Sequence, residues 1–197
     1  MTDPLFGGDD EANTPLEEEE PEQLIPSYIT TRPELNEAEQ VNITRASLWL
    51  RRARNVDVLD DAFLRELHKR MFGEVWKWAG QYRLTARNIG IEAYRLPMEL
   101  RGLADDVLFW GENGSYPPDE IAVRFSHRLV SIHPFPNGNG RLSRLAADLL
   151  VMRLGQPRFT WGQTSLLDPG ATRRAYVAAL QAADGGDIGP LLVFARS

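Results

Sequence analysis

The chain has 197 residues, of which 43% are hydrophobic and 25% charged, and its formal net charge at pH 7 is -6. This composition is typical of a globular protein, and no apolar run approaches the roughly 18 residues that span a bilayer. The chain has no cysteine and only three histidines, which excludes disulfides, thiolate chemistry and a histidine-rich metal cage. The first residues lack the basic start and apolar core of a signal peptide, so we expect a cytoplasmic protein without membrane contact.

The negative charge is concentrated in the first 24 residues. Residues 1–24 contain nine acids and no lysine or arginine, which leaves 19 acids against 22 bases in residues 25–197. The first segment carries too little apolar surface to fold, so we expect a disordered acidic leader over residues 1–24 and one domain over residues 25–197. The mildly basic domain suits a polyphosphate ligand, but its charge is too small to indicate nucleic acid.

Helical patterns dominate residues 25–197. Good helix formers, apolar residues at steps of three and four, and capping residues indicate a series of helices with short connections. In chain order, helices are expected over residues 35–54 and 62–72, around the apolar repeats at 100–108, 121–132, 142–152 and 176–183, and in a last short segment that Asp187 caps and that runs through Phe194.

Residues 80–96 break this pattern. The segment GQYRLTARNIGIEAYRL has no helical periodicity and contains glycine, β-branched and aromatic residues, which predicts a short β-hairpin. It contains no Asn-Gly or Asp-Gly turn that would set the register of the two strands. The expected fold class is therefore all-α, a helical bundle with one small β-hairpin.

The stretch SIHPFPNGNGRLSR, residues 131–144, contains the chemically informative residues. His133 closes one helix, two prolines interrupt it, and a Gly-Asn-Gly turn opens the next helix. Backbone N–H groups in such a turn, together with a helix N-terminus, can bind an anion. Arg141 and Arg144 stand in the first turns of that helix, where each positive charge costs about 0.3–1 kcal/mol unless an anion compensates. A di- or triphosphate would do so, although a solvated turn and a packed histidine are the simpler alternatives.

These residues resemble the motif of the Fic (Fic/Doc) family, His-x-Phe-x-(Asp/Glu)-Gly-Asn-Gly-Arg-x-x-Arg. Asn137 departs from it, and seven positions match: His133, Phe135, Gly138, Asn139, Gly140, Arg141 and Arg144. Residues 71–83 are also similar to the approach to the flap of that family. The resemblance covers roughly residues 60–197. The segments ITTRPELNEAEQ and DIGPLLVFARS resemble a group of Fic-type proteins called mobile mystery protein B.

The resemblance implies a Fic-type helical bundle and an enzyme that moves AMP from ATP, with Mg²⁺, to a Tyr, Thr or Ser hydroxyl of a target protein. His133 would be the general base, and Phe135 would anchor the loop in the core. Gly138, Asn139 and Gly140 would cradle the phosphates, and Arg141 and Arg144 would hold the outer ones. Residues 80–96 would form the flap, in which Ile89, Gly90 and Ile91 dock the target segment by main-chain pairing.

Asn137 stands where the family usually has an Asp or Glu that ligates Mg²⁺. Its side-chain carbonyl is a possible metal ligand, but the negative charge is lost. Three outcomes are open: a metal held mainly by phosphates, a slower enzyme, or a changed reaction.

Glu34 has two competing interpretations. TTRPEL, residues 30–35, resembles the inhibitory segment of Fic proteins, whose glutamate pairs with the second arginine of the motif, here Arg144. Thr31 and Glu34 also form a capping box, with Pro33 in the first turn of the helix. The first interpretation predicts autoinhibition, and the second predicts a structural role only.

Two alternatives to AMP transfer stay open. One is removal of AMP from a modified protein, with Glu34 positioning a water. The other is a nucleotide-binding regulatory module with weak catalysis, paired with a small antitoxin-like partner. Of the other histidines, we expect His68 on the surface and His127 packed against the domain.

Overall fold

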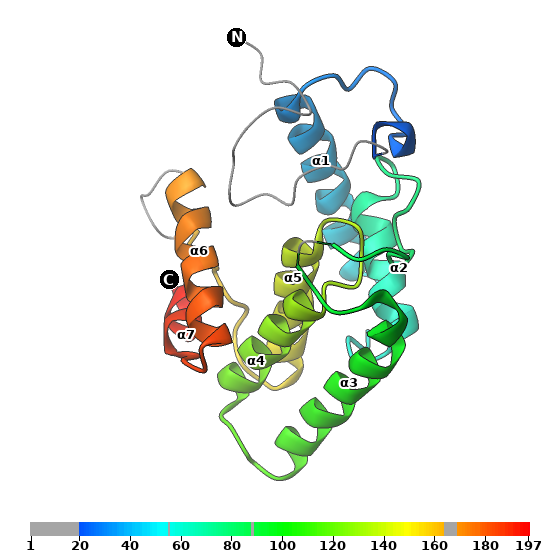
Figure 1. The fold of residues 1–197 in the computed structure, drawn as a ribbon. Helices are drawn as coiled ribbons and strands as arrows, with labels where there is room; N and C mark the ends of the chain where they lie inside the picture. The colour runs from blue at the N-terminus through cyan, green and yellow to red at the C-terminus, as the bar shows by residue number, and fades with distance from the viewer. Residues whose placement is uncertain (1–19, 55, 88, 164–168) are drawn as a thin grey trace. The chain divides into compact units, whose positions relative to one another are not determined.

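The computed structural model describes residues 20–54, 56–87, 89–163 and 169–197, and these residues confirm the all-α class. Their secondary structure is helical, with an isolated β-bridge between Leu24 and Trp76, and the described part of the chain forms no sheet. In chain order the helices are η1 (Glu20–Gln23), α1 (Arg32–Leu50), α2 (Asp61–Phe72), η2 (Ala93–Arg95), α3 (Leu96–Glu112), α4 (Pro118–Ile132), α5 (Asn139–Arg153), α6 (Pro169–Asp184) and α7 (Gly189–Arg196), where η denotes a 3-10 helix (Figure 1).

The chain divides into two compact units. The first comprises residues 1–83 together with Phe135–Gly138, and the second comprises Leu84–Pro134 and Asn139–Ser197. The chain therefore leaves the second unit after Pro134 and returns to it at the first residue of α5.

Helices α1 and α2 pack against each other in the first unit. The side chains of Thr31 and Asp60 cap the two helices, each by accepting a hydrogen bond from a first-turn amide. Asn42 of α1 joins them by donating to the carbonyl of Arg70 at 2.9 Å and accepting from the amide of Glu74 at 2.9 Å. The core of this unit consists of large apolar side chains, among them Leu35, Phe63, Leu67, Met71, Phe72 and Trp76.

The last part of the expected leader belongs to this unit. Leu24 forms an antiparallel bridge with Trp76, the amide of Ile25 donates to the carbonyl of Val75 at 2.9 Å, and the amide of Lys77 donates to Gln23 at 2.9 Å. These backbone bonds hold residues 23–25 beside Val75–Lys77, so the prediction of disorder was wrong for this stretch. Residues 1–19 lie outside the described residues.

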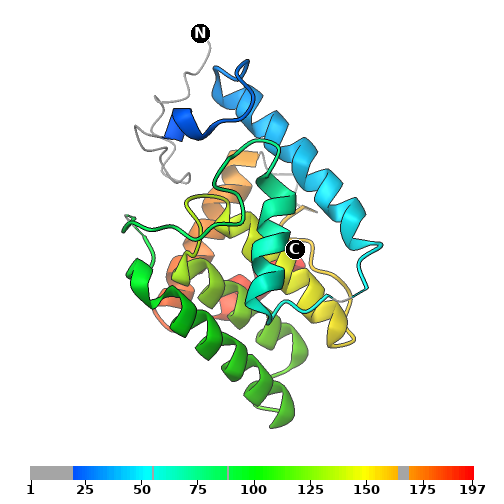
Figure 2. The same ribbon diagram turned by 90° about the vertical axis from the view of Figure 1, so that its right-hand side faces the viewer.

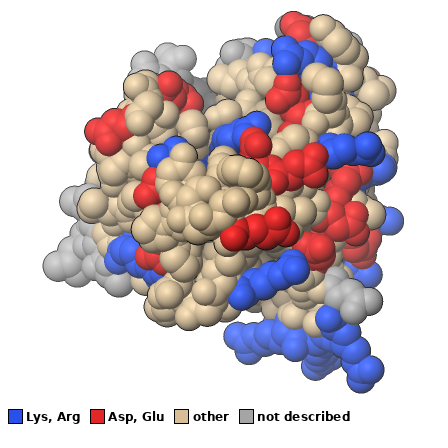
Figure 3. Space-filling model, turned by 90° about the horizontal axis from the view of Figure 1, so that it is seen from below, with Lys and Arg blue, Asp and Glu red and all other residues tan. Residues whose placement is uncertain are grey.

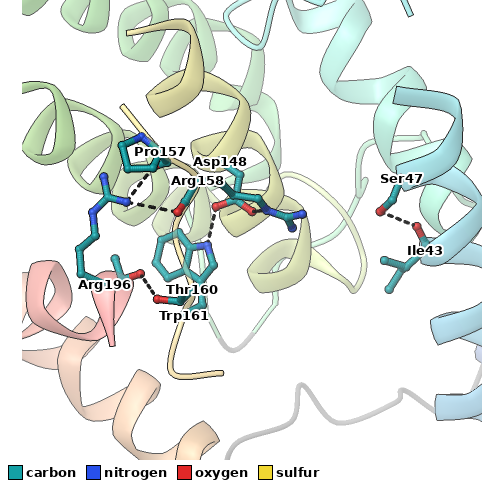
Figure 4. A network of polar contacts seen from close by, with 9 residues as sticks. Ile43, Ser47, Asp148, Pro157, Arg158, Thr160, Trp161 and Arg196 are labelled. Carbon is teal, nitrogen blue, oxygen red and sulfur yellow. Dashed lines mark hydrogen bonds and ion pairs between the residues drawn. The ribbon is translucent and has the colours of Figure 1, made fainter. Parts of the chain in front are cut away.

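The second unit contains α3 to α7. Helix α4 packs against α3, α5 and α7, and α6 packs against α7; Figure 2 shows α3, α4 and α5 from a second direction. Asp148 of α5, only 2% exposed, accepts hydrogen bonds from Trp161 Nε1 at 2.8 Å and Arg158 Nε at 2.7 Å (Figure 4). Arg196 of α7 donates to the carbonyl of Pro157 at 2.7 Å and so ties the last helix to the same loop.

The described residues of 80–96 do not form the expected β-hairpin. Among the described residues of 80–96 there is no strand, and the segment runs as an irregular loop that ends in η2. The amide of Gly80, which has a φ of +79°, donates to His68 Nδ1 at 3.0 Å and is therefore unavailable for strand pairing. Without a turn sequence that sets a register, no second strand forms along it.

Acidic and basic side chains intermix over the face drawn in Figure 3. Helix α4 illustrates this mixing, since Arg124 pairs with Glu120 at 2.7 Å and Arg128 pairs with Asp106 of α3. Exposed ion pairs of this kind contribute little to stability. None of the described helices has the length and apolar character needed to cross a bilayer.

Candidate active site

His133 stands at the C-terminal end of α4 in a left-handed backbone conformation. Its φ and ψ are 55° and 60°, its amide donates to the carbonyl of Leu129 at 3.3 Å, and the residue is 3% exposed. A left-handed residue other than glycine costs roughly 1–2 kcal/mol, and the following Pro134 prevents the helix from continuing. The strained backbone thus coincides with the histidine of the motif. Backbone strain of this kind is frequent at functional sites.

Helix α5 begins at Asn139, six residues after His133, and packs against α4. The first-turn amides of any helix point out of its N-terminal end and attract anions. Asn139 is 2% exposed, and the hydroxyl of Ser143 donates to the carbonyl of Gly140 at 3.1 Å, which holds the first turn in place. The second unit thus contains the histidine and the start of α5, as the motif predicts.

Arg141 and Arg144 of α5 are both half-buried. The guanidinium carbon of Arg144 lies 4.7 Å from the ring centre of Tyr176, a residue of α6 that is 7% exposed. Burial raises the pKa of Tyr176, against the opposing influences of Arg144 and the Ser143 hydroxyl, so the phenol stays protonated. Sequence reasoning placed Tyr176 only as an apolar position on a helix, and no motif marks its contact with Arg144.

The segment expected to dock a target runs beside the end of α4. The amide of Ile91 donates to the carbonyl of Ile132, the residue before His133, at 3.5 Å. Ile89 is 50% exposed, and Gly90 has a φ of +102° that only glycine adopts readily. Ile91 is therefore bonded to the residue before His133, while Ile89 and Gly90 form a bend rather than part of a hairpin strand.

The middle of the motif loop belongs to the first unit. Phe135 is fully buried and stacks on His68, with ring centres 3.8 Å apart and planes 10° apart. Gly138 has a φ of +78°, and a Cβ atom there would lie 2.6 Å from the ring of Phe72. The expected anchoring of Phe135 is observed, and glycine is required at Gly138 for both backbone conformation and space.

His68 was wrongly expected on the surface, since it is 0% exposed. Lys69 and Arg70 beside it suggested a solvated face, but Leu64 and Phe72 lie four residues away on either side and are buried. The periodicity of α2 therefore places His68 on the apolar stripe, and this signal was available in the sequence.

Asn137 uses its polar groups within the loop. Its Oδ1 accepts the amide of Gly138 at 2.6 Å, and its main-chain oxygen lies 3.1 Å from His68 Nε2. Mg²⁺ sites in proteins usually contain one or two carboxylates, and the described residues include no group of three His, Asp or Glu side chains that could hold a metal. The neutral, already bonded side chain of Asn137 does not fit a magnesium ligand.

Glu34 completes the capping box of α1. Its Oε2 accepts hydrogen bonds from the amides of Thr30 at 2.8 Å and Thr31 at 3.0 Å, while its own amide donates to Thr31 Oγ1 at 3.5 Å. The backbone bond from Thr30 is the largest cause that lowers the pKa of Glu34, and the residue is exposed. Of the two interpretations, the structural cap is the one that these bonds support.

Comparison with known proteins agrees with the family that the motif predicts. Residues 58–151 match the Fic/DOC family. The chain is 34% identical over 133 residues to Protein adenylyltransferase Fic of Drosophila grimshawi, which covers 66% of this chain and 26% of that protein. It is 32% identical over 131 residues to Protein adenylyltransferase fic-1 of Caenorhabditis elegans, and the match covers 64% of this chain and 24% of that protein.

Solved Fic domains have a similar fold. A Fic-1 fragment from Caenorhabditis elegans matches with a TM-score of 0.64 and 25% identity, covering 90% of this chain and 51% of that one. BepC from Bartonella tribocorum, solved with bound AMPPNP, matches with a TM-score of 0.65 and 20% identity. The match covers 91% of this chain and 97% of that one. Residues 58–151 of the chain therefore belong to the Fic/DOC family. The chain spans about a quarter of the length of the two relatives that are named adenylyltransferases.

Proposed function

We propose that this chain transfers AMP from ATP to a hydroxyl side chain of a target protein. The observation that carries the proposal is the buried His133 at the end of α4, followed six residues later by the start of α5, whose first turns contain Arg141 and Arg144. A base, a helix N-terminus and two guanidinium groups are the parts that a nucleotide transfer without a covalent intermediate requires. The names of the two relatives at 34% and 32% identity support the same activity.

In the proposed reaction, the hydroxyl oxygen of a target Tyr, Thr or Ser attacks the α-phosphorus of ATP. The bond from this phosphorus to the bridging oxygen breaks, pyrophosphate leaves, and AMP stays on the target as a phosphodiester. His133 takes the hydroxyl proton, a step that contributes about 10²–10⁴-fold when the base is well positioned. Because the donor of AMP is ATP itself, no further co-reactant is needed.

The phosphates would lie at the start of α5. The amides of Asn139 and Gly140 would donate to phosphate oxygens, and Arg141 and Arg144 would hold the outer phosphates through their planar guanidinium groups. Gly138 contributes the turn, since its amide already donates to Asn137 Oδ1 at 2.6 Å. Developing negative charge at the α-phosphate and on the pyrophosphate would be stabilised by the same donors.

No step of this proposal passes through Mg²⁺. Asn137 supplies no charge, and its side-chain oxygen is bonded within the loop. Phosphate oxygens of ATP bind Mg²⁺ in water, so a magnesium ion would reach the site as part of the nucleotide rather than through a protein carboxylate.

The target segment would pair with main-chain groups of Ile89–Ile91. Main-chain pairing is sequence-tolerant, and it would bring the target hydroxyl toward His133 because Ile91 is bonded to Ile132. Autoinhibition through Glu34 stays a separate prediction, because the carboxylate would first have to leave its bonds to Thr30 and Thr31.

A second candidate function follows from Asn137. If the missing carboxylate makes transfer too slow, the chain would act as a nucleotide-binding regulatory module with a small antitoxin-like partner. Removal of AMP from a modified protein would be a hydrolysis at the same site: a water positioned by Glu34 attacks the phosphorus, the bond from phosphorus to the target oxygen breaks, and AMP and the free hydroxyl are released.

Incubation with ATP labelled at the α-phosphate, in a lysate as the source of targets, tests the proposal. We expect label on protein with the parent chain and a loss of at least 100-fold with His133→Ala. The matched control is His127→Ala, which removes a histidine that bonds Asp184 at 2.7 Å. If neither the parent nor the variants label any protein while ATP still binds, the regulatory module is favoured. Release of AMP from a pre-labelled target would favour removal of AMP as the activity.

A further inference from the structure

His68 is a fully buried histidine whose two ring nitrogens both meet backbone groups. Nδ1 accepts the amide of Gly80 at 3.0 Å, and Nε2 lies 3.1 Å from the main-chain oxygen of Asn137. The ring stacks on Phe135 at 3.8 Å and tilts against Phe72 at 4.8 Å. These contacts all lie within the first unit.

The two backbone partners require the same tautomer. An amide can only donate, so Nδ1 must present its lone pair to Gly80. A carbonyl can only accept, so the ring hydrogen is on Nε2 and points at Asn137. A doubly protonated ring would set an N–H against the amide of Gly80, so the ring in this arrangement is neutral.

The hydrogen bond to Asn137 acts on one particular peptide unit. The carbonyl of Asn137 and the amide of Gly138 belong to the same planar group. His68 binds that carbonyl at 3.1 Å, and Asn137 Oδ1 binds that amide at 2.6 Å. Both polar groups of this peptide are hydrogen-bonded, and Gly138 lies so close to Phe72 that a Cβ atom would be 2.6 Å from the ring. The peptide plane is therefore held in one orientation.

We infer that His68 is a positioning residue for the phosphate-binding loop, fixing the Asn137–Gly138 peptide from which α5 starts one residue later. The inference rests on the proposed function, since it assigns the loop to the phosphates. His68 contacts neither the nucleotide nor the target in this scheme, and its hydrogen bonds act through Asn137 and Gly80.

Two substitutions separate the hydrogen bonds of His68 from its packing. His68→Phe keeps an aromatic ring against Phe135 and removes both bonds, whereas His68→Gln retains one donor and one acceptor. We expect the dissociation constant for ATP to rise about tenfold in the first variant and to stay within about threefold of the parent in the second. The matched controls His127→Phe and His127→Gln should leave it unchanged.

A second measurement requires no nucleotide and no activity. We expect amide hydrogen exchange of peptides covering residues 79–83 and 134–140 to accelerate in His68→Phe and to recover in His68→Gln. In the parent, nitrogen NMR of the imidazoles should show a neutral His68 ring protonated at Nε2.

The outcomes distinguish this inference from the proposed function. Unchanged exchange of residues 134–140 or unchanged ATP affinity in a folded His68→Phe would overturn the role of His68, as would a ring protonated at Nδ1 in the parent. If the parent transfers no AMP but the exchange and tautomer results hold, the proposed function fails and the positioning of the loop stands.

Discussion

The guanidinium carbon of Arg144 lies 4.7 Å from the centre of the Tyr176 ring, so a residue of α6 supports an arginine of the motif on α5. An arginine over an aromatic face is attracted to the ring and loses conformational freedom. This contact places Arg144 near the start of α5 before any anion arrives.

We expect Tyr176→Leu to weaken ATP binding by about fivefold, which corresponds to roughly 1 kcal/mol for a cation–π contact. Tyr176→Phe keeps the ring and should bind ATP like the parent. Calorimetric titration with ATP measures both, and Tyr94→Leu is a control because Tyr94 is 82% exposed. Equal affinity of the Leu and Phe variants would show that the ring does not hold Arg144.

Asn137→Asp should introduce a metal requirement. An aspartate restores a negative ligand for Mg²⁺, so ATP affinity should increase with Mg²⁺ concentration more steeply in the variant than in the parent. Titrations with ATP in EDTA and in Mg²⁺ measure the difference. Asn137→Ala is the matched control, since it removes the Gly138 bond without adding charge. A parent that already depends on Mg²⁺ as strongly as the variant would contradict our interpretation of Asn137.

The cap formed by Glu34 should make stability depend on pH. Its pKa is lowered from the ordinary value of 4.5, so the cap contributes fully above that value and is lost as the pH falls through the folded-state pKa. The melting temperature of the parent should therefore exceed that of Glu34→Gln by more at pH 7 than at pH 3. A difference that does not change with pH would mean that the charge of Glu34 contributes nothing to the cap.

The same residue tests autoinhibition. If Glu34 acts only as a cap, Glu34→Gln should leave the rate of AMP transfer near that of the parent. A large increase in labelled product would instead show that the carboxylate restrains the enzyme.

Asp148 should be a stability residue of the second unit. Asp148→Ala leaves the buried indole N–H of Trp161 unpaired, which we expect to cost about 2 kcal/mol. Asp148→Asn keeps an acceptor for that N–H and should cost less than about 1 kcal/mol. Denaturant unfolding measures both. Arg158 is 58% exposed and can return to water, so its lost ion pair adds little. Equal losses for the two variants would argue against the Trp161 bond as the main contribution.

Local sequence determined much of this protein. Helical periodicity predicted the helices, the capping box of Thr31 and Glu34 marked one helix start, and the spacing from His133 to Arg144 predicted the family. These features depend on residues within a few turns of one another, where backbone sterics and capping bonds act without the rest of the fold.

The tertiary structure decided the remainder. It buried His68 against Phe135, which lies 67 positions further along the chain, and it set Tyr176 under Arg144. It also engaged Gly80 with His68 instead of with a second strand. Contacts of this kind join segments that are distant in sequence. A single sequence does not show which buried face of one segment packs against which face of another, because this depends on close packing and on the pairing of buried polar groups in the folded protein.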